Sequence, residues 1–274
     1  LDGVGGSGPG GRILRADVEA AAAGSRTSAT GANVGTDELD EVVREPLSGA
    51  RNAMFRHMGE SSSQLATTTS TFTVRMERIE ALIADLRGDG PEPAHPGIGV
   101  LSIAATCVVR ALLDNPRFNA TTDAETDDLC LHRRVHLGIA VASPTGLLVP
   151  VLRQADDMRL VQIGHGIANI AERARQGSLA TADLRGGTFT LSSTGGLERS
   201  RVTSTQPIVN LPQVAILWMS RIRDEPVVDG GAIRPGRMMS CSLSFDHRYI
   251  DGAEATKFIN DLTDLIEHPV RVLL

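Results

Sequence analysis

The stretch SLSFDHRYIDGAEA, residues 242–255, holds the residues best placed for acid–base chemistry. His247 follows a long apolar run typical of a β-strand, and Asp246, Arg248 and Asp251 lie around it. An imidazole titrates near neutral pH, and neighbouring carboxylates can fix its tautomer and bias its pKa. The stretch therefore suits a general base at a strand end. The alternative is a structural ion-pair cluster in which His247 takes no part.

A second candidate site lies in GGTFTLSSTGG, residues 186–196, where a strand pattern ends in a glycine turn. Ser192 or Ser193 could donate a hydrogen bond to a developing oxyanion there. Either hydroxyl could also be a nucleophile, although no G-x-S-x-G elbow surrounds them, or an ordinary turn serine.

Other kinds of site receive little support. The histidines and cysteines show no metal-ligand spacing, so no metal is expected. Cys107, Cys130 and Cys241 are far apart and odd in number, which indicates reduced, buried thiols. The glycines of DGVGGSGPGG fit a dinucleotide-loop spacing, but no strand precedes them, so they are interpreted as a turn.

Composition limits the class of protein. The chain has 274 residues, of which 41% are hydrophobic and 22% charged, so it can bury a sizeable core. Its formal net charge of -6 does not favour nucleic-acid binding, and no apolar run reaches the length of a membrane span. Neither nucleic acid nor membrane is therefore expected as a partner.

The elements that position these residues mix strands and helices without regular alternation. Strands are predicted for 71–77 and 187–193, in two runs around a turn at 144–146, and within 213–222 and 238–248. Helices are predicted near 47–58, 76–87, 98–114, 160–174 and 252–267 from their apolar spacing. The pattern predicts an α/β (α+β) fold. Residues 1–24 form a small unit, 25–43 a Ser/Thr/Gly-rich linker, and 44–274 the folded domain.

The segment SFDHRYIDGAEATKFINDLTDLIEHP resembles the D-H-R-x-x-D-G signature and C-terminal helix of acyltransferase components of 2-oxo acid dehydrogenase complexes. GGTFTLSSTGG, TQPIVNLPQVAIL, HLGIAVASPTGLLVPVLRQAD and REPLSGARNAMFRHM resemble other blocks of that catalytic domain, in the same order. VGGSGPGGRILRADVEAA resembles the second half of a peripheral-subunit-binding domain.

The resemblance implies a chloramphenicol-acetyltransferase-like mixed sheet with flanking helices, and a partial helical module at the N-terminus. It implies acyl transfer between dihydrolipoamide and coenzyme A. His247 matches the base, Ser192 the oxyanion donor, with Ser193 the alternative, and Asp251 a supporting residue. Arg51 matches an arginine expected to pair with an acid of the signature, and Asp246 is a further supporting residue.

The resemblance also implies partners. It implies a homotrimer with active sites between subunits, assembling into a larger core, and partner decarboxylating dehydrogenase and dihydrolipoyl dehydrogenase components, for which Arg12 is a retained contact. The family's lipoyl lysine is expected on a domain absent from this chain, and the compartment is the bacterial cytoplasm or, alternatively, the mitochondrial matrix. Trp218, Met219 and Ser220 stand where relatives often have smaller, glycine-containing sequence, which alters either the acyl pocket or the packing between subunits.

Several points stay open at this stage. The native acyl group is acetyl or branched-chain, and the size of the core is not fixed. The alternative functions are a chloramphenicol-acetyltransferase-like enzyme acting on a small acceptor and a catalytically inactive structural core protein.

Overall fold

The computed structural model describes residues 8–10, 15, 45–47, 49–87 and 97–273. The chain divides into two compact units, Leu1–Pro46 and Leu47–Leu274. Within the first unit, residues 8–10 form a turn in which Gly10 has a φ of 73°, a conformation that favours glycine. The predicted small unit, the linker and Arg12 lie almost wholly outside the described residues, so their boundaries stay predictions.

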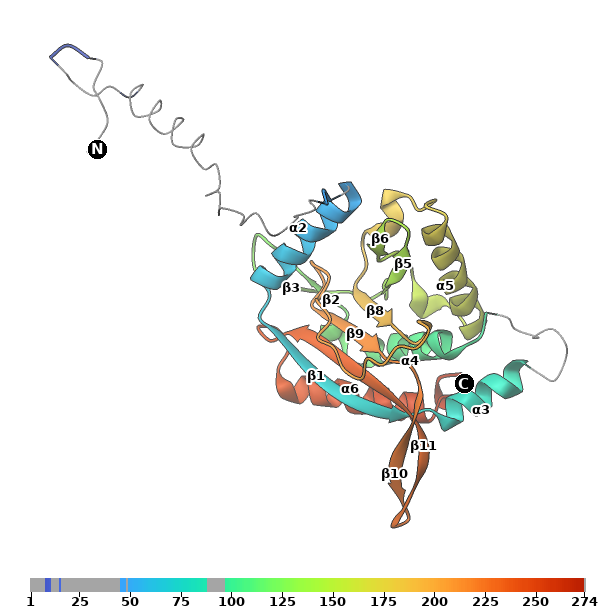
Figure 1. Ribbon diagram of the computed structural model, residues 1–274. Helices are drawn as coiled ribbons and strands as arrows, with labels where there is room; N and C mark the ends of the chain where they lie inside the picture. The colour runs from blue at the N-terminus through green and yellow to red at the C-terminus, as the bar shows by residue number, and fades with distance from the viewer. Residues whose placement is uncertain (1–7, 11–14, 16–44, 48, 88–96, 274) are drawn as a thin grey trace, which may run out of the picture. The chain divides into compact units, whose positions relative to one another are not determined.

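The second unit is built on a seven-stranded mixed sheet (Figure 1). Its strand order is β1-β11-β9-β8-β4-β7, and β10 pairs with β11 outside that path. β8 runs parallel to β4 and β9, whereas β11 is antiparallel to all its partners. The strands, including those of two small sheets, are β1 (Thr67–Arg75), β2 (Ala120–Thr122), β3 (Leu129–Leu131), β4 (Leu137–Ile139), β5 (Val141–Ser143), β6 (Gly146–Leu148), β7 (Val151–Leu152), β8 (Phe189–Ser193), β9 (Ala215–Met219), β10 (Arg223–Asp229) and β11 (Ala232–Asp246).

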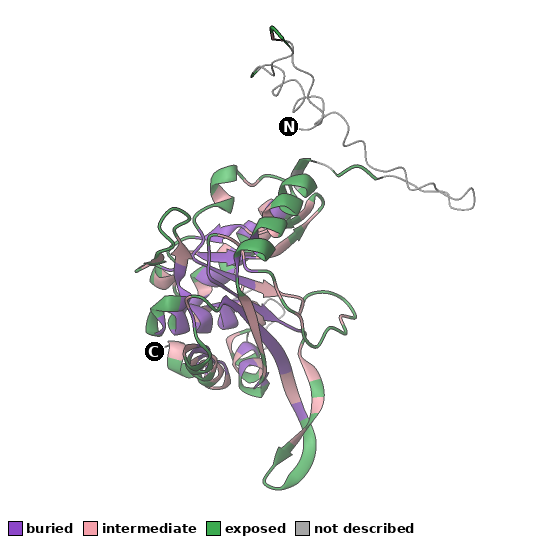
Figure 2. Cartoon of the chain, turned by 90° about the vertical axis from the view of Figure 1, so that its left-hand side faces the viewer, coloured by how far each residue is buried: buried purple, intermediate pink, exposed green. Residues whose placement is uncertain are grey.

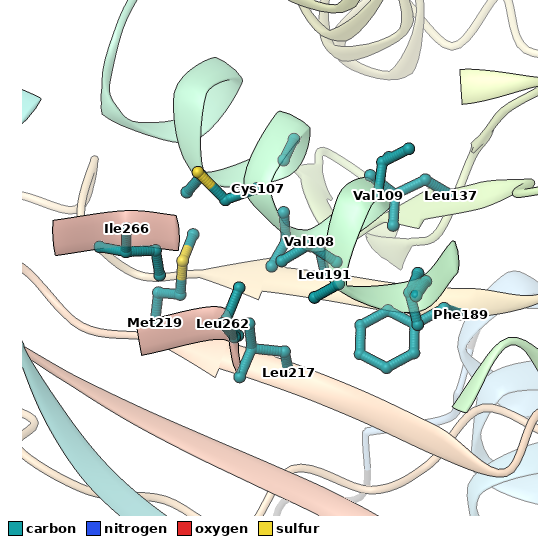
Figure 3. Packing of buried hydrophobic residues seen from close by; sticks show 14 of the residues in the cluster. Cys107, Val108, Val109, Leu137, Phe189, Leu191, Leu217, Met219, Leu262 and Ile266 are labelled. Carbon is teal, nitrogen blue, oxygen red and sulfur yellow. The ribbon is translucent and has the colours of Figure 1, made fainter. Parts of the chain in front are cut away.

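The helices that follow β1 in the chain pack on one face of this sheet and form the core with it. The α-helices are α2 (Gly49–Gln64), α3 (Glu77–Arg87), α4 (Val100–Asp114), α5 (Leu160–Arg175), α6 (Gly252–Glu267) and α7 (Val270–Leu273). Figure 3 shows α4 side chains, among them Val108, meeting Leu191 and Leu217 from the sheet and Leu262 from α6. In β11, Cys241, Leu243 and Phe245 belong to this core because alternate residues face the helices.

The opposite face of the sheet carries hydroxyl groups. Ser242 and Ser244 alternate with the core residues of β11, and both are fully buried. Their hydroxyls lie 3.2 Å from Thr71 Oγ1 and 2.7 Å from Thr69 Oγ1 on β1. Each buried hydroxyl therefore has a cross-strand partner, which avoids the cost of leaving it unsatisfied.

Most predicted elements are confirmed, and the mixed sheet with flanking helices is the expected fold class. The strand expected at 71–77 spans Thr67–Arg75 instead. Its first residues were missed because this run of hydroxyl residues shows no alternation of apolar and polar side chains. The two runs expected around the turn at 144–146 are four short strands, in which β5 pairs with β6 and β4 pairs with β7.

The β10–β11 hairpin was not predicted. β10 is mostly exposed and charged, and it contains Pro226, so it has no apolar face to indicate a strand. Figure 2 shows the hairpin extending away from the buried part of the sheet as an exposed ribbon. The available signal was the turn: Gly230 and Gly231 both have positive φ, as a tight two-residue hairpin turn requires.

Among the helices of the described ranges, none has the length and apolar character needed to cross a membrane.

The packing of α6 gives a test of the core. Phe258 is fully buried, and its ring stacks on that of Phe118 with centroids 4.3 Å apart. Phe258→Ala should lower the free energy of unfolding by about 3–5 kcal/mol, because it removes that contact and leaves a cavity. Urea denaturation followed by circular dichroism measures the change. The exposed Asn260→Ala on the same helix is the control, with an effect within ~0.5 kcal/mol; equal losses would contradict this account of the core.

Candidate active site

The imidazole of His247 lies at the point where β11 ends. Asp246 is the last residue of the strand, and the His247 N–H donates to the Ala66 carbonyl at 2.9 Å. The side chain is exposed, and its ring is tilted against that of Phe245 with centroids 5.8 Å apart. The backbone is therefore held firmly, while the imidazole stays accessible to a substrate.

Asp246 anchors this strand end through Arg248. The carboxylate is fully buried and accepts bonds from Arg248 Nε at 3.0 Å and Nη2 at 2.6 Å. The Arg248 backbone N–H donates to the same carboxylate at 3.1 Å. The side-chain hydrogen bonds to Asp246 raise the pKa of Arg248, so the guanidinium stays charged. Asp246 therefore fixes the turn that presents His247.

Asp251 caps the N-terminus of α6, the helix that follows the His247 turn. Its carboxylate accepts a bond from the Glu254 N–H at 2.8 Å, and Glu254 Oε2 accepts from the Asp251 N–H at 3.1 Å. This reciprocal pair is a capping box, which starts α6 directly after the His247 turn. The residue predicted to support the site thus holds the helix that follows it.

Ser192 and Ser193 lie on opposite faces of the sheet. Ser193 pairs in register with Met219, a core residue, and its hydroxyl accepts a bond from the Gly195 N–H at 3.1 Å. It lines a pocket of about 480 Å³ with Leu101, Ser220, Ile222 and other residues of the helix side. Ser192 faces the other way, toward the hydroxyl-bearing face.

The register defines a row of side chains through Ser192, here called the Ser192 row. Ser192 pairs with Trp218, Trp218 with Ser242, and Ser242 with Thr71, across β8, β9, β11 and β1. Ser192 therefore lies among the hydroxyl groups of this face and away from the turn that carries His247.

One chain does not bring Ser192 and His247 together. His247 lies five positions beyond Ser242, the β11 member of the Ser192 row. At about 3.3 Å per residue along a strand and ~4.8 Å between strands, the two residues are on the order of 15–20 Å apart. The predicted base and the predicted oxyanion donor therefore cannot act on one thioester within a single chain.

The remaining predicted residues lie elsewhere. Arg51 is exposed on α2, and its Cγ lies beside Gly146 of β6. Asp246, one acid of the signature, is bonded to Arg248. The expected pairing of Arg51 with an acid of the signature stays a prediction. Arg12 falls outside the described residues.

One group near Ser192 was missed from the sequence. The Thr194 hydroxyl is buried without a hydrogen-bond partner among the described residues, two positions after Ser192. An unsatisfied buried hydroxyl is uncommon in native proteins, so it marks a place where a ligand atom could bond. No local pattern in the sequence distinguishes Thr194 from an ordinary turn residue.

In the described part of the chain, no residues are arranged to bind a metal ion, and two of the three cysteines are buried. Within these ranges, no three or more His, Cys, Asp or Glu residues are grouped to hold a metal ion. Burial raises the pKa of the Cys107 and Cys241 thiols to about 12, so both stay protonated at neutral pH. Cys130 is exposed.

Comparison with known proteins places the chain in a group. The family of 2-oxoacid dehydrogenases acyltransferase catalytic domains matches residues 40–274. A dihydrolipoyllysine-residue succinyltransferase component of the 2-oxoglutarate dehydrogenase complex from Pseudomonas aeruginosa is 36% identical over 99% of this chain and 68% of its own length. A lipoamide acyltransferase component of the branched-chain alpha-keto acid dehydrogenase complex from the same organism is 36% identical, over 99% of this chain and 63% of that relative.

Solved structures agree with this grouping. An Azotobacter vinelandii dihydrolipoamide acetyltransferase is similar with a TM-score of 0.80 and 31% identity, over 88% of this chain and 98% of that one. That structure concerns the roles of a serine, a histidine and an asparagine in the catalytic mechanism. The cubic core of a pyruvate dehydrogenase multienzyme complex has a TM-score of 0.78 and 32% identity, over 88% and 98% of the two chains.

The Asp246–Arg248 pair gives a test of how the site is held. Arg248→Met leaves the buried carboxylate without its guanidinium and should lower the free energy of unfolding by about 3 kcal/mol. This is the low end of the cost of breaking a buried pair, because the Arg248 side chain is itself 43% exposed. Urea denaturation measures it, with Arg110→Met, whose pair with Asp114 is about half exposed, as control. A loss no larger than that of the control would show that the pair does not anchor the turn.

Proposed function

The chain belongs to the 2-oxoacid dehydrogenase acyltransferases, and we propose that it transfers an acyl group between dihydrolipoamide and coenzyme A. The observation that carries the proposal is the placement of His247, an accessible imidazole on a strand end that is fixed by the bond between the buried Asp246 carboxylate and Arg248. In the similar acetyltransferase, the asparagine under study follows the histidine by four positions, the spacing of Asp251 from His247.

The proposed chemistry is direct transfer between thiols. A thiol has a pKa near 8.5, so most of it is protonated at neutral pH and a base is needed. His247 takes the thiol proton, and the sulfur forms a bond to the thioester carbonyl carbon. Ser192 donates to the resulting oxyanion. The intermediate then collapses, the other carbon–sulfur bond breaks, and the protonated imidazole returns its proton to the departing thiolate.

The proposed substrates and partners are those that the family resemblance implies. Coenzyme A and a dihydrolipoyl group are the acyl carriers, and the lipoyl group belongs to a domain outside this chain. The chain spans about two thirds of the curated relatives that it matches. The proposal therefore includes docking of the decarboxylating dehydrogenase and dihydrolipoyl dehydrogenase components, and a bacterial cytoplasmic location.

The separation of Ser192 from His247 supports an active site shared between copies. The register puts them on the order of 15–20 Å apart in one chain, too far for one reaction. A cyclic trimer, in which the serine of one copy meets the histidine of the next, removes that difficulty. The similar cubic core is consistent with trimers that assemble further. We include the trimer, and a larger core built from it, in the proposal.

Substitution of the two residues tests the chemistry. With acetyl-CoA and dihydrolipoamide, His247→Ala should lower kcat by ~10²–10⁴-fold and Ser192→Ala by ~10²–10³-fold, from loss of the base and of the oxyanion donor. Ser193→Ala, on the opposite face, is the matched control and should change kcat by no more than a few-fold. Near-normal turnover by His247→Ala would refute the assignment. Transfer to chloramphenicol but not to dihydrolipoamide would favour a small-acceptor enzyme, and no transfer to either would favour a structural core protein.

Mixing the two inactive variants tests the shared site. Ser192→Ala and His247→Ala subunits, unfolded and refolded together in equal amounts, should regain about a quarter of wild-type activity. In a cyclic trimer, each site then has about a one-in-four chance of receiving both native residues. Each variant refolded alone is the control. If the mixture stays as inactive as the separate variants, while refolded wild type is active, each site lies within one chain.

A further inference from the structure

We infer that Trp218 forms the wall of the acyl pocket beside Ser192 and restricts the acyl group to a small one such as acetyl. The inference rests on the proposed function, since it assumes that the Ser192 hydroxyl meets the thioester carbonyl. It deepens that function by naming the substrate class, which the succinyl and branched-chain relatives leave open.

The register places the indole directly beside the serine. Trp218 on β9 is the Cα partner of Ser192 on β8, and directly paired residues of neighbouring strands point to the same face. An acyl group is bonded to the carbonyl carbon that Ser192 would contact. Whatever the acyl group is, its first carbons therefore lie within reach of the side chains that flank Ser192.

The two flanks differ in size. On the β4 side, the Ala140 N–H donates to the Leu191 carbonyl at 2.9 Å, so a methyl group comes next to Ser192. On the β9 side stands the largest side chain that proteins contain. The β9 flank of Ser192 is therefore the one that sets how much room an acyl group has.

Trp218 is buried on the hydroxyl-bearing face of the sheet, opposite the helix-covered core. Its side chain is 3% exposed, yet it is absent from both buried hydrophobic clusters of the described chain. Its other strand neighbour in the Ser192 row is Ser242, whose hydroxyl is approached by the Thr205 N–H at 3.5 Å. By contrast, Ile216, two residues earlier on the same face, packs with Leu65 and Val209. The register thus places the indole between Ser192 and Ser242, on the face of the sheet that the helices do not cover.

The consequence for specificity is steric. A single methylene in a fitted apolar pocket changes kcat/KM by about 10–200-fold, and a branched or carboxylated acyl chain adds several heavy atoms to acetyl. A rigid, close-packed indole cannot move aside without disturbing its neighbours. Wild-type protein should therefore favour acetyl-CoA over 2-methylpropanoyl-CoA and succinyl-CoA by at least about 10-fold in kcat/KM.

Enlarging the pocket tests the inference. Trp218→Ala should raise the ratio of kcat/KM for 2-methylpropanoyl-CoA to that for acetyl-CoA by about 10-fold or more, and Trp218→Phe by less. Ile216→Ala, also a loss of a buried side chain from this face of β9, is the control and should leave the ratio unchanged. Circular dichroism melting establishes that each variant is folded. An unchanged ratio in folded Trp218→Ala, or a wild type that favours the larger donors, would overturn the inference.

The wild-type protein offers a second measurement that needs no variant. Trp218 is the only tryptophan of the chain, so intrinsic fluorescence reports on this wall alone. Saturation with acetyl-CoA should change its emission differently from saturation with coenzyme A, because only the former places an acyl group there. Identical spectra would contradict the inference. Failure of the proposed function has another sign, the absence of transfer by wild type from any acyl donor, whereas failure of this inference alone leaves transfer intact and the donor ratio of Trp218→Ala unchanged.

Discussion

The pairing of β11 with β1 on one side and β9 on the other is the constraint on which the site depends. Alternate residues of β11 belong to the helix-covered core or to the hydroxyl-bearing face. A slip of one residue would turn Leu243 and Phe245 away from the helices and press serines against them. Because that exchange is so unfavourable, the register is fixed, and with it the points at which Asp246 ends the strand and His247 emerges.

The β11 serines of the hydroxyl-bearing face are as buried as the core, but they are stabilised in a different way. Ser242 and Ser244 are fully buried, and each hydroxyl can be buried without a large cost because a threonine of β1 lies within hydrogen-bond distance. Such a face is closely packed yet still offers polar contacts, which suits the thioester binding that is proposed for Ser192. The same rule makes the unpartnered Thr194 hydroxyl notable, since its neighbourhood satisfies nearly every other group.

How much of this could be predicted from the sequence depends on the range of the interactions. The helix at 160–174 was predictable because its apolar spacing is local, and the D-H-R-x-x-D-G residues were recognisable for the same reason. The β10–β11 hairpin was missed because a strand without a buried face has no periodic signal. The face of the sheet that each of Ser192 and Ser193 occupies, and the distance from Ser192 to His247, depend on pairings between strands far apart in the chain. No local pattern encodes those pairings.

That distance has a consequence for how activity is tied to assembly in the proposed enzyme. An oxyanion donor acts best where water is excluded, and His247 in the single chain is exposed. A site completed by a neighbouring copy gains the serine and a cover over the imidazole in the same step. A lone chain would then carry a base without an oxyanion donor and a serine without a base. Both chemical competence and exclusion of water would thus come from the contact between subunits, while β11 supplies the rigidity that makes the two halves fit.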